Sequence, residues 1–339
     1  MLFFIFAGLI ACAGKPVSAS CPIEIIPPRV VVRYGDPISV NCSSPSNQIE
    51  GMGWESPYEG VPLTQGVSFL PLQIKSLKAW ELEPKCYINF NSGDQCLESL
   101  SVTVYRKADS VSMTPPSKTG HMVEGKNYRM QCDIANVAPA RNLSVYWFKG
   151  NEILRNESFD KESNLSPVNL SSVLNLTAHR GDNGSHIRCE AWLNLGPAGP
   201  NLVLRSKSHD VTVLYPPAFV KPEKENVTLI AGGRISLNCT ATGNPMPSYS
   251  WQLSHVIQEE NKNQDENQPT LTISYPGTYN CTVSNTQGTK TKYFTVTGAE
   301  TGQPGTTAGI LIAVFFVFIF ILGCMVYHKQ RNSPVATSA

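Results

Sequence analysis

The sequence carries none of the short motifs that mark common enzyme active sites. It has no Gly-x-Ser-x-Gly, no His-Glu-x-x-His and no glycine-rich phosphate loop. Its six histidines are scattered, and none lies at zinc-ligand spacing from a cysteine or another histidine. The net charge is +1, without a run of Lys or Arg that would mark a nucleic-acid or polybasic surface. We therefore expect neither an enzyme, nor a cofactor, nor a nucleic-acid-binding protein.

Long hydrophobic runs occur only near the two ends of the chain. Leu2 to Ile10 is apolar, and the small residues Val17 to Ala19 follow it, so residues 1–20 are predicted to be a signal peptide. Residues 308–327 are twenty residues without a charge, about the length that a helix needs to cross a bilayer.

Positive residues follow that second run, at Lys329 and Arg331, and positive residues stay in the cytoplasm. The expected topology is therefore a type I single-pass protein of the plasma membrane. Residues 299–307 would form a stalk, residues 308–327 the transmembrane helix and residues 328–339 a cytoplasmic tail. A tail of this length does not fold, so the function is expected to lie in the ectodomain.

Cysteine spacing indicates the fold of that ectodomain. Cys42 and Trp54 are twelve residues apart, as are Cys239 and Trp251, an interval typical of immunoglobulin-type sandwiches. Three bridges follow from spacing, namely Cys42–Cys86, Cys132–Cys189 and Cys239–Cys281. We predict an all-β fold of three tandem immunoglobulin-like sandwiches, residues 21–108, 109–215 and 216–298, with the proline pairs Pro115–Pro116 and Pro216–Pro217 near the junctions.

Two cysteines remain, Cys21 and Cys96. Cys21 should open the first strand of the first domain and Cys96 its last strand, which we expect to run from Leu97 to Tyr105. Those strands are neighbours in variable-like sandwiches, so a Cys21–Cys96 bridge is geometrically reasonable. An intermolecular bond and a reshuffled pairing are the alternatives.

Glu55 is the main candidate for a functional residue. Side chains alternate along a strand, so a buried Trp54 places Glu55 in water on the opposite face. A carboxylate at the end of a rigid strand can ligate a hard metal ion on another protein, although it can equally be an ordinary solvated acid. With Cys86 and Ile88 inward, Tyr87 and Asn89 should point outward from the neighbouring strand.

Glycosylation sequons are distributed unevenly over the predicted domains. Six of the ten fall within residues 109–215, and the first domain has one, on the side away from Glu55. Glycans keep a surface from docking a protein, so the face that carries Glu55 is predicted to be bare. The ten are Asn41, Asn142, Asn156, Asn164, Asn169, Asn175, Asn183, Asn226, Asn238 and Asn280.

From Val30 to Pro217 the chain resembles the intercellular adhesion molecule family. The second-domain pattern of that family is similar to Gly125–Asn127, Cys132, Ala138–Val145 and Lys149–Glu152. Trp54–Pro57 resembles the family's isoleucine-glutamate-threonine-proline segment. Vascular cell adhesion molecules have a similar segment with aspartate in place of glutamate. Pro84–Asn89 resembles the strand beside it. The family's second bridge between the strands that carry Cys42 and Cys86, four residues after each cysteine, is absent, because Ser46 and Phe90 occupy its positions.

The resemblance implies a function for this face. In these families the acid completes the coordination of Mg²⁺ in the metal-ion-dependent adhesion site of an integrin. Glu55 is the matching position, and Tyr87 and Asn89 match flanking contacts, whereas Lys85 stands where the family often has an apolar residue. We expect a cell-surface ligand for leukocyte-type integrins. The alternative is a cation-independent immunoglobulin-type module, either homophilic or a ligand of a non-integrin receptor.

Overall fold

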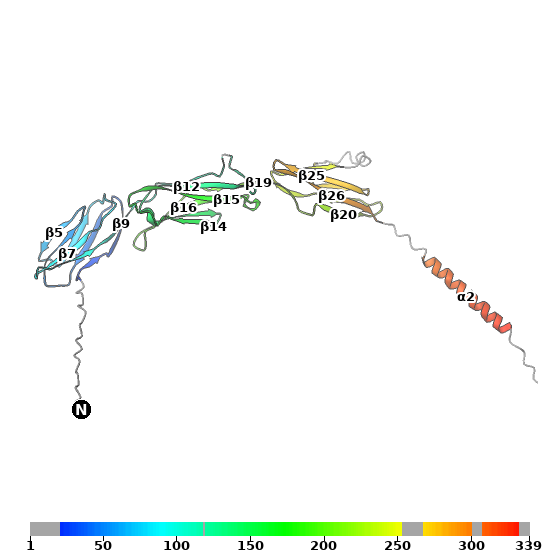
Figure 1. Cartoon of the computed structure of the whole chain (residues 1–339), viewed down its shortest axis with the longest axis horizontal. Helices are drawn as coiled ribbons and strands as arrows, with labels where there is room; N and C mark the ends of the chain where they lie inside the picture. Colours follow the sequence, from blue (N-terminus) through cyan, green and yellow to red (C-terminus); the bar gives the residue numbers. More distant parts are fainter. Residues whose placement is uncertain (1–20, 118, 253–266, 300–306, 332–339) are drawn as a thin grey trace, which may run out of the picture. The chain divides into compact units, whose positions relative to one another are not determined.

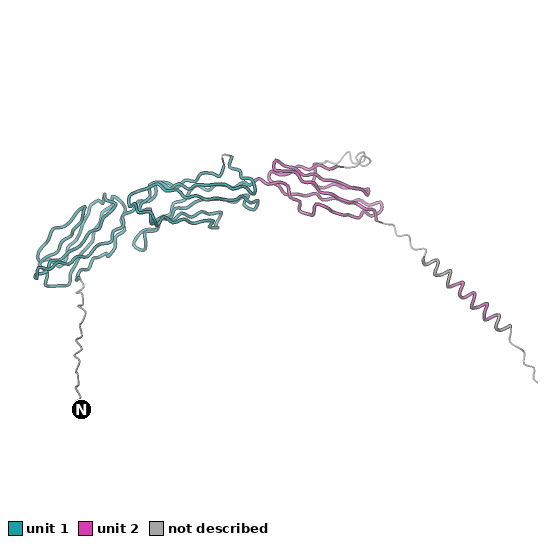
Figure 2. Tube along the Cα trace, in the orientation of Figure 1, with its two compact units in different colours: residues 1–213 teal, residues 214–339 magenta. Residues whose placement is uncertain are grey.

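The computed structural model describes residues 21–117, 119–252, 267–299 and 307–331. The predicted signal peptide, most of the predicted stalk and the end of the predicted tail lie outside these residues. The chain divides into two compact units, residues 1–213 and 214–339 (Figure 2). Each unit is built from antiparallel sheets, with a few parallel pairings, so the prediction of an all-β fold for this part of the chain is confirmed.

The first part of unit 1 is a sandwich of two main sheets, ordered β1-β3-β6 and β5-β4-β7-β8, with β2 and β9 paired in parallel. The inward side chains of both sheets form one apolar core around the Cys42–Cys86 bridge and Trp54. The strands are β1 (Glu24–Ile26), β2 (Arg29–Arg33), β3 (Ile38–Ser43), β4 (Ile49–Glu55), β5 (Val61–Gln65), β6 (Phe69–Ile74), β7 (Lys85–Phe90), β8 (Gln95–Ser99) and β9 (Ser101–Tyr105), of which β5, β7 and β9 are labelled in Figure 1.

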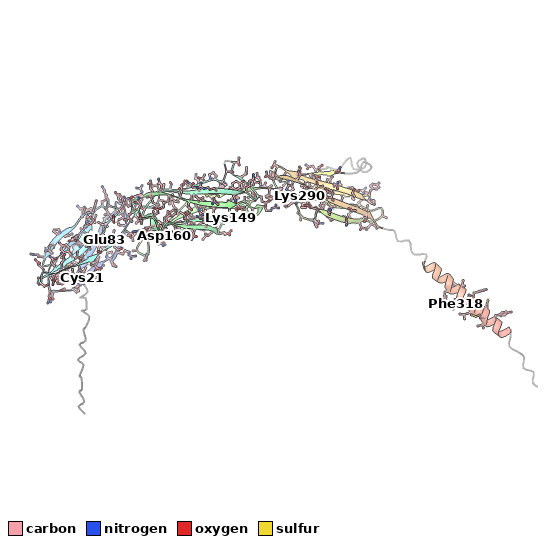
Figure 3. The ribbon with its side chains drawn as sticks, viewed as in Figure 1. Cys21, Glu83, Lys149, Asp160, Lys290 and Phe318 are labelled. Atoms are coloured by element: carbon pink, nitrogen blue, oxygen red, sulfur yellow. A yellow bond between two sulfur atoms is a disulfide. The ribbon has the colours of Figure 1, made fainter. Side chains whose placement is uncertain are left out.

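The expected single strand from Leu97 to Tyr105 is wrong, because the structure divides it at Leu100. The side chain of Leu100 is buried, and its backbone N–H donates to the carbonyl oxygen of Pro84 at 2.8 Å. β8 therefore pairs with β7, whereas β9 pairs with β2. Cys96 lies in β8 and is bonded to Cys21, which Figure 3 labels.

The second part of unit 1 has the sheets β10-β12-β15 and β14-β13-β16-β17, and β18 also pairs with β16. The Cys132–Cys189 bridge and the fully buried Trp147 lie in its core. The elements are β10 (Ser110–Thr114), β11 (His121–Val123), β12 (Asn127–Val137), η1 (Ala140–Asn142), β13 (Leu143–Lys149), β14 (Glu152–Ser158), β15 (Val168–Thr177), η2 (Arg180–Asp182), β16 (His186–Asn194), β17 (Asn201–Arg205) and β18 (His209–Asp210).

Unit 2 contains the sheets β20-β26-β25-β23 and β21-β24, which pack around Cys239–Cys281 and Trp251. The buried Tyr279, two residues before Cys281, donates its hydroxyl to the carbonyl of Tyr275 at 2.8 Å, which forms a tyrosine corner. The strands are β19 (Thr212–Phe219), which begins in unit 1, β20 (Lys224–Leu229), β21 (Ile235–Asn238), β22 (Ala241–Asn244), β23 (Ser248–Gln252), β24 (Thr270–Ile273), β25 (Gly277–Asn285) and β26 (Gly288–Gly298).

One helix, α2 (Thr307–Arg331), follows the strands of unit 2. Its apolar side chains project from the helix on several sides, Phe318 among them (Figure 3). Within the described part of the chain, no helix meets the length and hydropathy that a membrane span requires.

Candidate functional site

The end of β4 presents Glu55. The preceding Trp54 is 2% exposed, and its indole N–H donates to the carbonyl oxygen of Leu70 in β6 at 3.1 Å. Met52, two residues earlier, is fully buried on the same inward face. Because the strand alternates, Glu55 is exposed on the opposite face. The fixed tryptophan therefore anchors the strand end that carries the carboxylate.

The carboxylate of Glu55 has no partner among the described residues, where no ion pair or side-chain hydrogen bond involves it. Across the sheet, its Cα partner is Lys85 in β7, whose side chain is also exposed. Opposite charges on neighbouring strands attract weakly in water. Glu55 is therefore available to an external cation without first breaking a strong internal bond.

The loop after Glu55 folds back against β4. The hydroxyl of Ser56 accepts the backbone N–H of Tyr58 at 3.3 Å, and the hydroxyl of Tyr58 donates to the carbonyl of Ser76 at 3.1 Å. A Cβ at Gly60 would lie 2.8 Å from the carbonyl oxygen of Trp54, so only glycine fits there without a shift. This packing defines where the strand ends.

Tyr87 and Asn89 lie on the same outer sheet face as Glu55. Tyr87 is the cross-strand partner of Gly53, and its ring lies over that glycine so closely that a Cβ there would overlap the ring. Asn89 is half-buried, and its side-chain carbonyl accepts a hydrogen bond from the amide of Gln95 in β8 at 3.1 Å. All three predicted site residues therefore share one face, although Tyr87 and Asn89 are partly occupied by contacts within the sheet.

Sequence reasoning missed two features of this face. The first is Gly53, together with Gly51, where a Cβ would lie 2.5 Å from the backbone oxygen of Thr64. Glycines inside a strand signal close approach of another group, so the Gly-x-Gly of β4 was an available signal. The second is Leu97, the β8 partner of Tyr87, which is 42% exposed. These residues make the face flat and partly apolar.

The sequon of the first sandwich lies on its other sheet. Asn41 belongs to β3, which pairs with β1 and β6, whereas Glu55 belongs to the β5-β4-β7-β8 sheet. Of the six sequons within residues 109–215, five asparagines are exposed, while Asn142 is half-buried and donates its amide to the carbonyl of Asn194 at 2.7 Å. Their modification stays a prediction.

The chain offers no metal site of its own in the part that the structure describes. No group of three or more His, Cys, Asp or Glu side chains gathers there in a way that could hold an ion. A single carboxylate such as Glu55 offers only one of the several oxygen ligands that a Mg²⁺ ion requires.

Sequence comparison relates the chain to adhesion molecules. The family model described as immunoglobulin domain matches residues 217–297. Intercellular adhesion molecule 1 of Bos taurus is 24% identical over 239 residues, which cover 70% of this chain and 43% of that protein. The Rattus norvegicus protein of the same name is 28% identical over 188 residues, covering 55% and 32%. Cell adhesion molecule 3 of Rattus norvegicus is 26% identical over 242 residues, covering 64% and 59%.

Among solved structures, an ICAM-5 D1–D4 ectodomain fragment is 17% identical, with a TM-score of 0.45, and the match covers 81% of this chain and 76% of that one. The chain spans less than half the length of the intercellular adhesion molecules reported above. The sequence matches, the immunoglobulin domain and the disulfide-linked sandwiches agree with one another. The chain therefore contains an immunoglobulin domain and is similar in sequence to the intercellular adhesion molecules.

Proposed function

We propose that this protein is a cell-surface adhesion receptor whose first sandwich is a ligand for leukocyte-type integrins. The observation that carries the proposal is the exposed, unpartnered carboxylate of Glu55 at the end of β4. It stands on a flat sheet face, and the one sequon of that sandwich is on the other sheet. The relatives that the sequence matches are named as adhesion molecules, which supports the same conclusion.

In this proposal Glu55 supplies an oxygen ligand to a Mg²⁺ ion that the integrin holds. Mg²⁺ favours oxygen ligands in near-octahedral geometry at about 2.0–2.1 Å, so the position of the carboxylate must be well defined. The packing of Trp54 and of the loop that ends at Gly60 provides that definition. Tyr87 and Asn89 lie farther along the same face, opposite Gly53 and Gly51, and would contact the protein surface around the ion.

The proposal includes the placement of this face outside the cell. Three tandem immunoglobulin-like domains, residues 21–108, 109–215 and 216–298, would precede a single membrane-spanning helix at residues 308–327. This topology is supported by the absence of charge in those twenty residues and by Lys329 and Arg331 directly after them. The first domain would then be the one farthest from the membrane along the chain.

The test is adhesion of leukocytes to the full-length protein on transfected cells, in Mg²⁺ and then in EDTA. Glu55→Ala is compared with Glu59→Ala, which removes an exposed acid from the adjoining loop. We expect adhesion that EDTA abolishes, and a loss of at least about thirtyfold in affinity for Glu55→Ala, the size of an interface hot spot. Glu59→Ala should bind normally.

Two results would contradict the proposal. Adhesion that survives both EDTA and Glu55→Ala would point to a cation-independent partner, which is the alternative function. Equal losses for Glu55→Ala and Glu59→Ala would mean that general negative charge, and not one ligand position, controls binding. Surface expression of each variant, and normal formation of the Cys42–Cys86 bridge, serve as folding controls.

A further inference from the structure

The second sandwich exposes an aromatic cluster on the outer face of the β14-β13-β16-β17 sheet. Tyr146 and Trp192 have ring centroids 5.0 Å apart, and Phe148 lies 6.5 Å from Tyr146. Trp192 is 41% exposed, although tryptophan is usually covered in a folded protein. Tyr146 and Phe148 are half-buried, so Trp192 supplies most of the exposed aromatic surface. Exposed apolar surface of this kind marks a place where another group packs.

A buried carboxylate holds this cluster rigid. Glu190, which is 1% exposed, accepts the indole N–H of Trp192 at 3.0 Å, and the guanidinium groups of Arg188 and Arg205 at 2.9 Å each. The guanidinium of Arg188 also lies over the ring of Phe148, 4.5 Å from its centroid. The exposed face of Trp192 is therefore preorganised, which lowers the entropic cost of packing a ligand against it.

The cluster borders a shallow hollow of about 400 Å³. Its lining comes from three neighbouring strands. It combines the aromatic residues Tyr146 and Trp192 and the polar residues Ser144, Asn194 and Asn201 with the aliphatic residues Leu193, Leu202 and Val203. Sugar-sized ligands suit such a lining, because a pyranose ring presents C–H groups on its faces and hydroxyls at its edge. The C–H groups carry a partial positive charge that the negative face of an aromatic ring attracts.

A glycosylation sequon stands beside this hollow on the same face. Asn156 lies in the edge strand β14 and is exposed, and its cross-strand partner is Tyr146. Directly opposed residues on one face have Cβ atoms about 5 Å apart, so a sugar on Asn156 begins next to the Tyr146 ring. Ser158 completes the sequon and is likewise paired with Ser144, which lines the hollow.

We propose that the N-glycan on Asn156 packs its first sugars across Tyr146 and Trp192 and occupies the hollow. The modification then covers the aromatic face in place of a protein partner. Asn156 would therefore differ from the exposed sequon asparagine Asn175, which lies in β15 of the opposite sheet. The glycan of Asn156 would be ordered against the protein, whereas the glycan of Asn175 would extend into solvent. This proposal does not depend on integrin binding.

The test is hydroxyl-radical footprinting of the full-length protein from cells that perform N-glycosylation, read by mass spectrometry at single residues. In the wild type, Asn156 should carry a glycan and Trp192 should oxidise slowly. Both Asn156→Gln and Ser158→Ala abolish the sequon, so each should raise Trp192 oxidation severalfold. Asn175→Gln is the matched control and should leave it unchanged. The buried Trp147 should stay unlabelled throughout, which verifies folding.

The proposal is overturned by an unmodified Asn156, or by equal Trp192 oxidation in the wild type and both sequon variants. If Trp192 loses its protection in Asn142→Gln but keeps it in Asn156→Gln, the glycan on Asn142 is the covering group. Protection that persists in the Asn156 variants and disappears on dilution would identify a second copy of the chain as the occupant. Each of these outcomes rejects the Asn156 glycan as the covering group.

Discussion

Two properties distinguish Glu55 from other carboxylates of this chain, namely whether the carboxylate has a bonding partner and where it lies in its strand. Glu124 is bound by the guanidinium of Arg180 at 2.7 Å, and Glu50 accepts the amide of Gln65 at 3.2 Å. Glu55 and Glu59 are both exposed, but only Glu55 ends a strand whose inward tryptophan is fixed in the core. A fixed position matters because coordination of Mg²⁺ tolerates little displacement. This contrast is why Glu59 is the control for Glu55.

Gly53 determines where the Tyr87 ring lies, and Gly53→Ala tests this. The new Cβ would overlap the ring, so Tyr87 must leave its place, at a cost of about 1–3 kcal/mol for overpacking. We expect faster hydrogen exchange in β4 and β7 and weaker leukocyte adhesion. In Tyr87→Ala the same Gly53→Ala change should cost much less, because the clash is gone.

Gly181→Ala is the control, since a Cβ there meets nothing within 4 Å. Its effect on exchange in β4 and β7 should be negligible. If Gly53→Ala changes neither exchange nor adhesion, the ring of Tyr87 moves freely and does not help to define the site.

At this scale the sequence predicted which side chains point outward but not how they contact one another. Period-two alternation, with Trp54 inward, was sufficient to place Glu55, Tyr87 and Asn89 on one face. The overlap of Tyr87 with Gly53 depends on the register between β4 and β7, which a single sequence does not contain. For the same reason the bond from Gln95 to Asn89 was not foreseen.

At the scale of elements, β16 is held to its neighbours by the buried Glu190. Burial raises the pKa of this carboxyl, but the hydrogen bonds from Arg188 and Trp192 and the charge of Arg205 outweigh burial, so its pKa is lowered overall. A lowered pKa in the folded state means that the interaction contributes stability above the unfolded pKa of about 4.5. That contribution is lost as the pH falls through the folded-state pKa.

Glu190→Gln should therefore destabilise the second sandwich near neutral pH, by about 1–3 kcal/mol for lost charge-assisted hydrogen bonds. The difference from the wild type should shrink as the pH falls below about 4.5, because protonation removes the same charge. Hydrogen exchange of the β16 amides at several pH values measures both effects. Glu152→Gln, which removes a mostly exposed acid paired to Lys149 at 3.6 Å, is the control. A difference that is constant with pH would contradict this account.

The disulfide pairs were predicted correctly, but the division of one expected strand into two was not. Spacing predicted the Cys42–Cys86, Cys132–Cys189 and Cys239–Cys281 pairs, and the structure contains these bridges together with Cys21–Cys96. The division of Leu97–Tyr105 at Leu100 escaped prediction, although the apolar alternation of Leu100, Val102 and Val104 is out of phase with Leu97. The hydrogen bond from Leu100 to Pro84, which redirects the chain from β7 to β2, is a tertiary contact.

At the scale of the whole molecule, the disulfide-linked sandwiches and the helix α2 follow one another along the chain, and their cysteines indicate the compartment of each. Eight cysteines are joined in four bridges within residues 21–281, and stable disulfides require an oxidising compartment. The one free cysteine of the described part is Cys324 in α2. The separation of bridged cysteines from the free Cys324 agrees with the proposed arrangement, in which the sandwiches lie outside the cell and α2 lies in the membrane.

A truncation tests whether that segment anchors the protein. A chain stopped after Ala299 lacks α2, and we expect it to be secreted into the medium with its disulfides intact. The full chain should stay with the membrane pellet after alkaline carbonate washing, because twenty uncharged residues partition into the bilayer. A chain stopped after Arg331 keeps the helix and its flanking positive residues, so it should pellet like the full chain and serves as the control.

Release of the full chain by carbonate, or membrane retention of the chain stopped at Ala299, would show that residues 308–327 are not the anchor. Glu55 would then have to act from a protein held at the cell surface by other means.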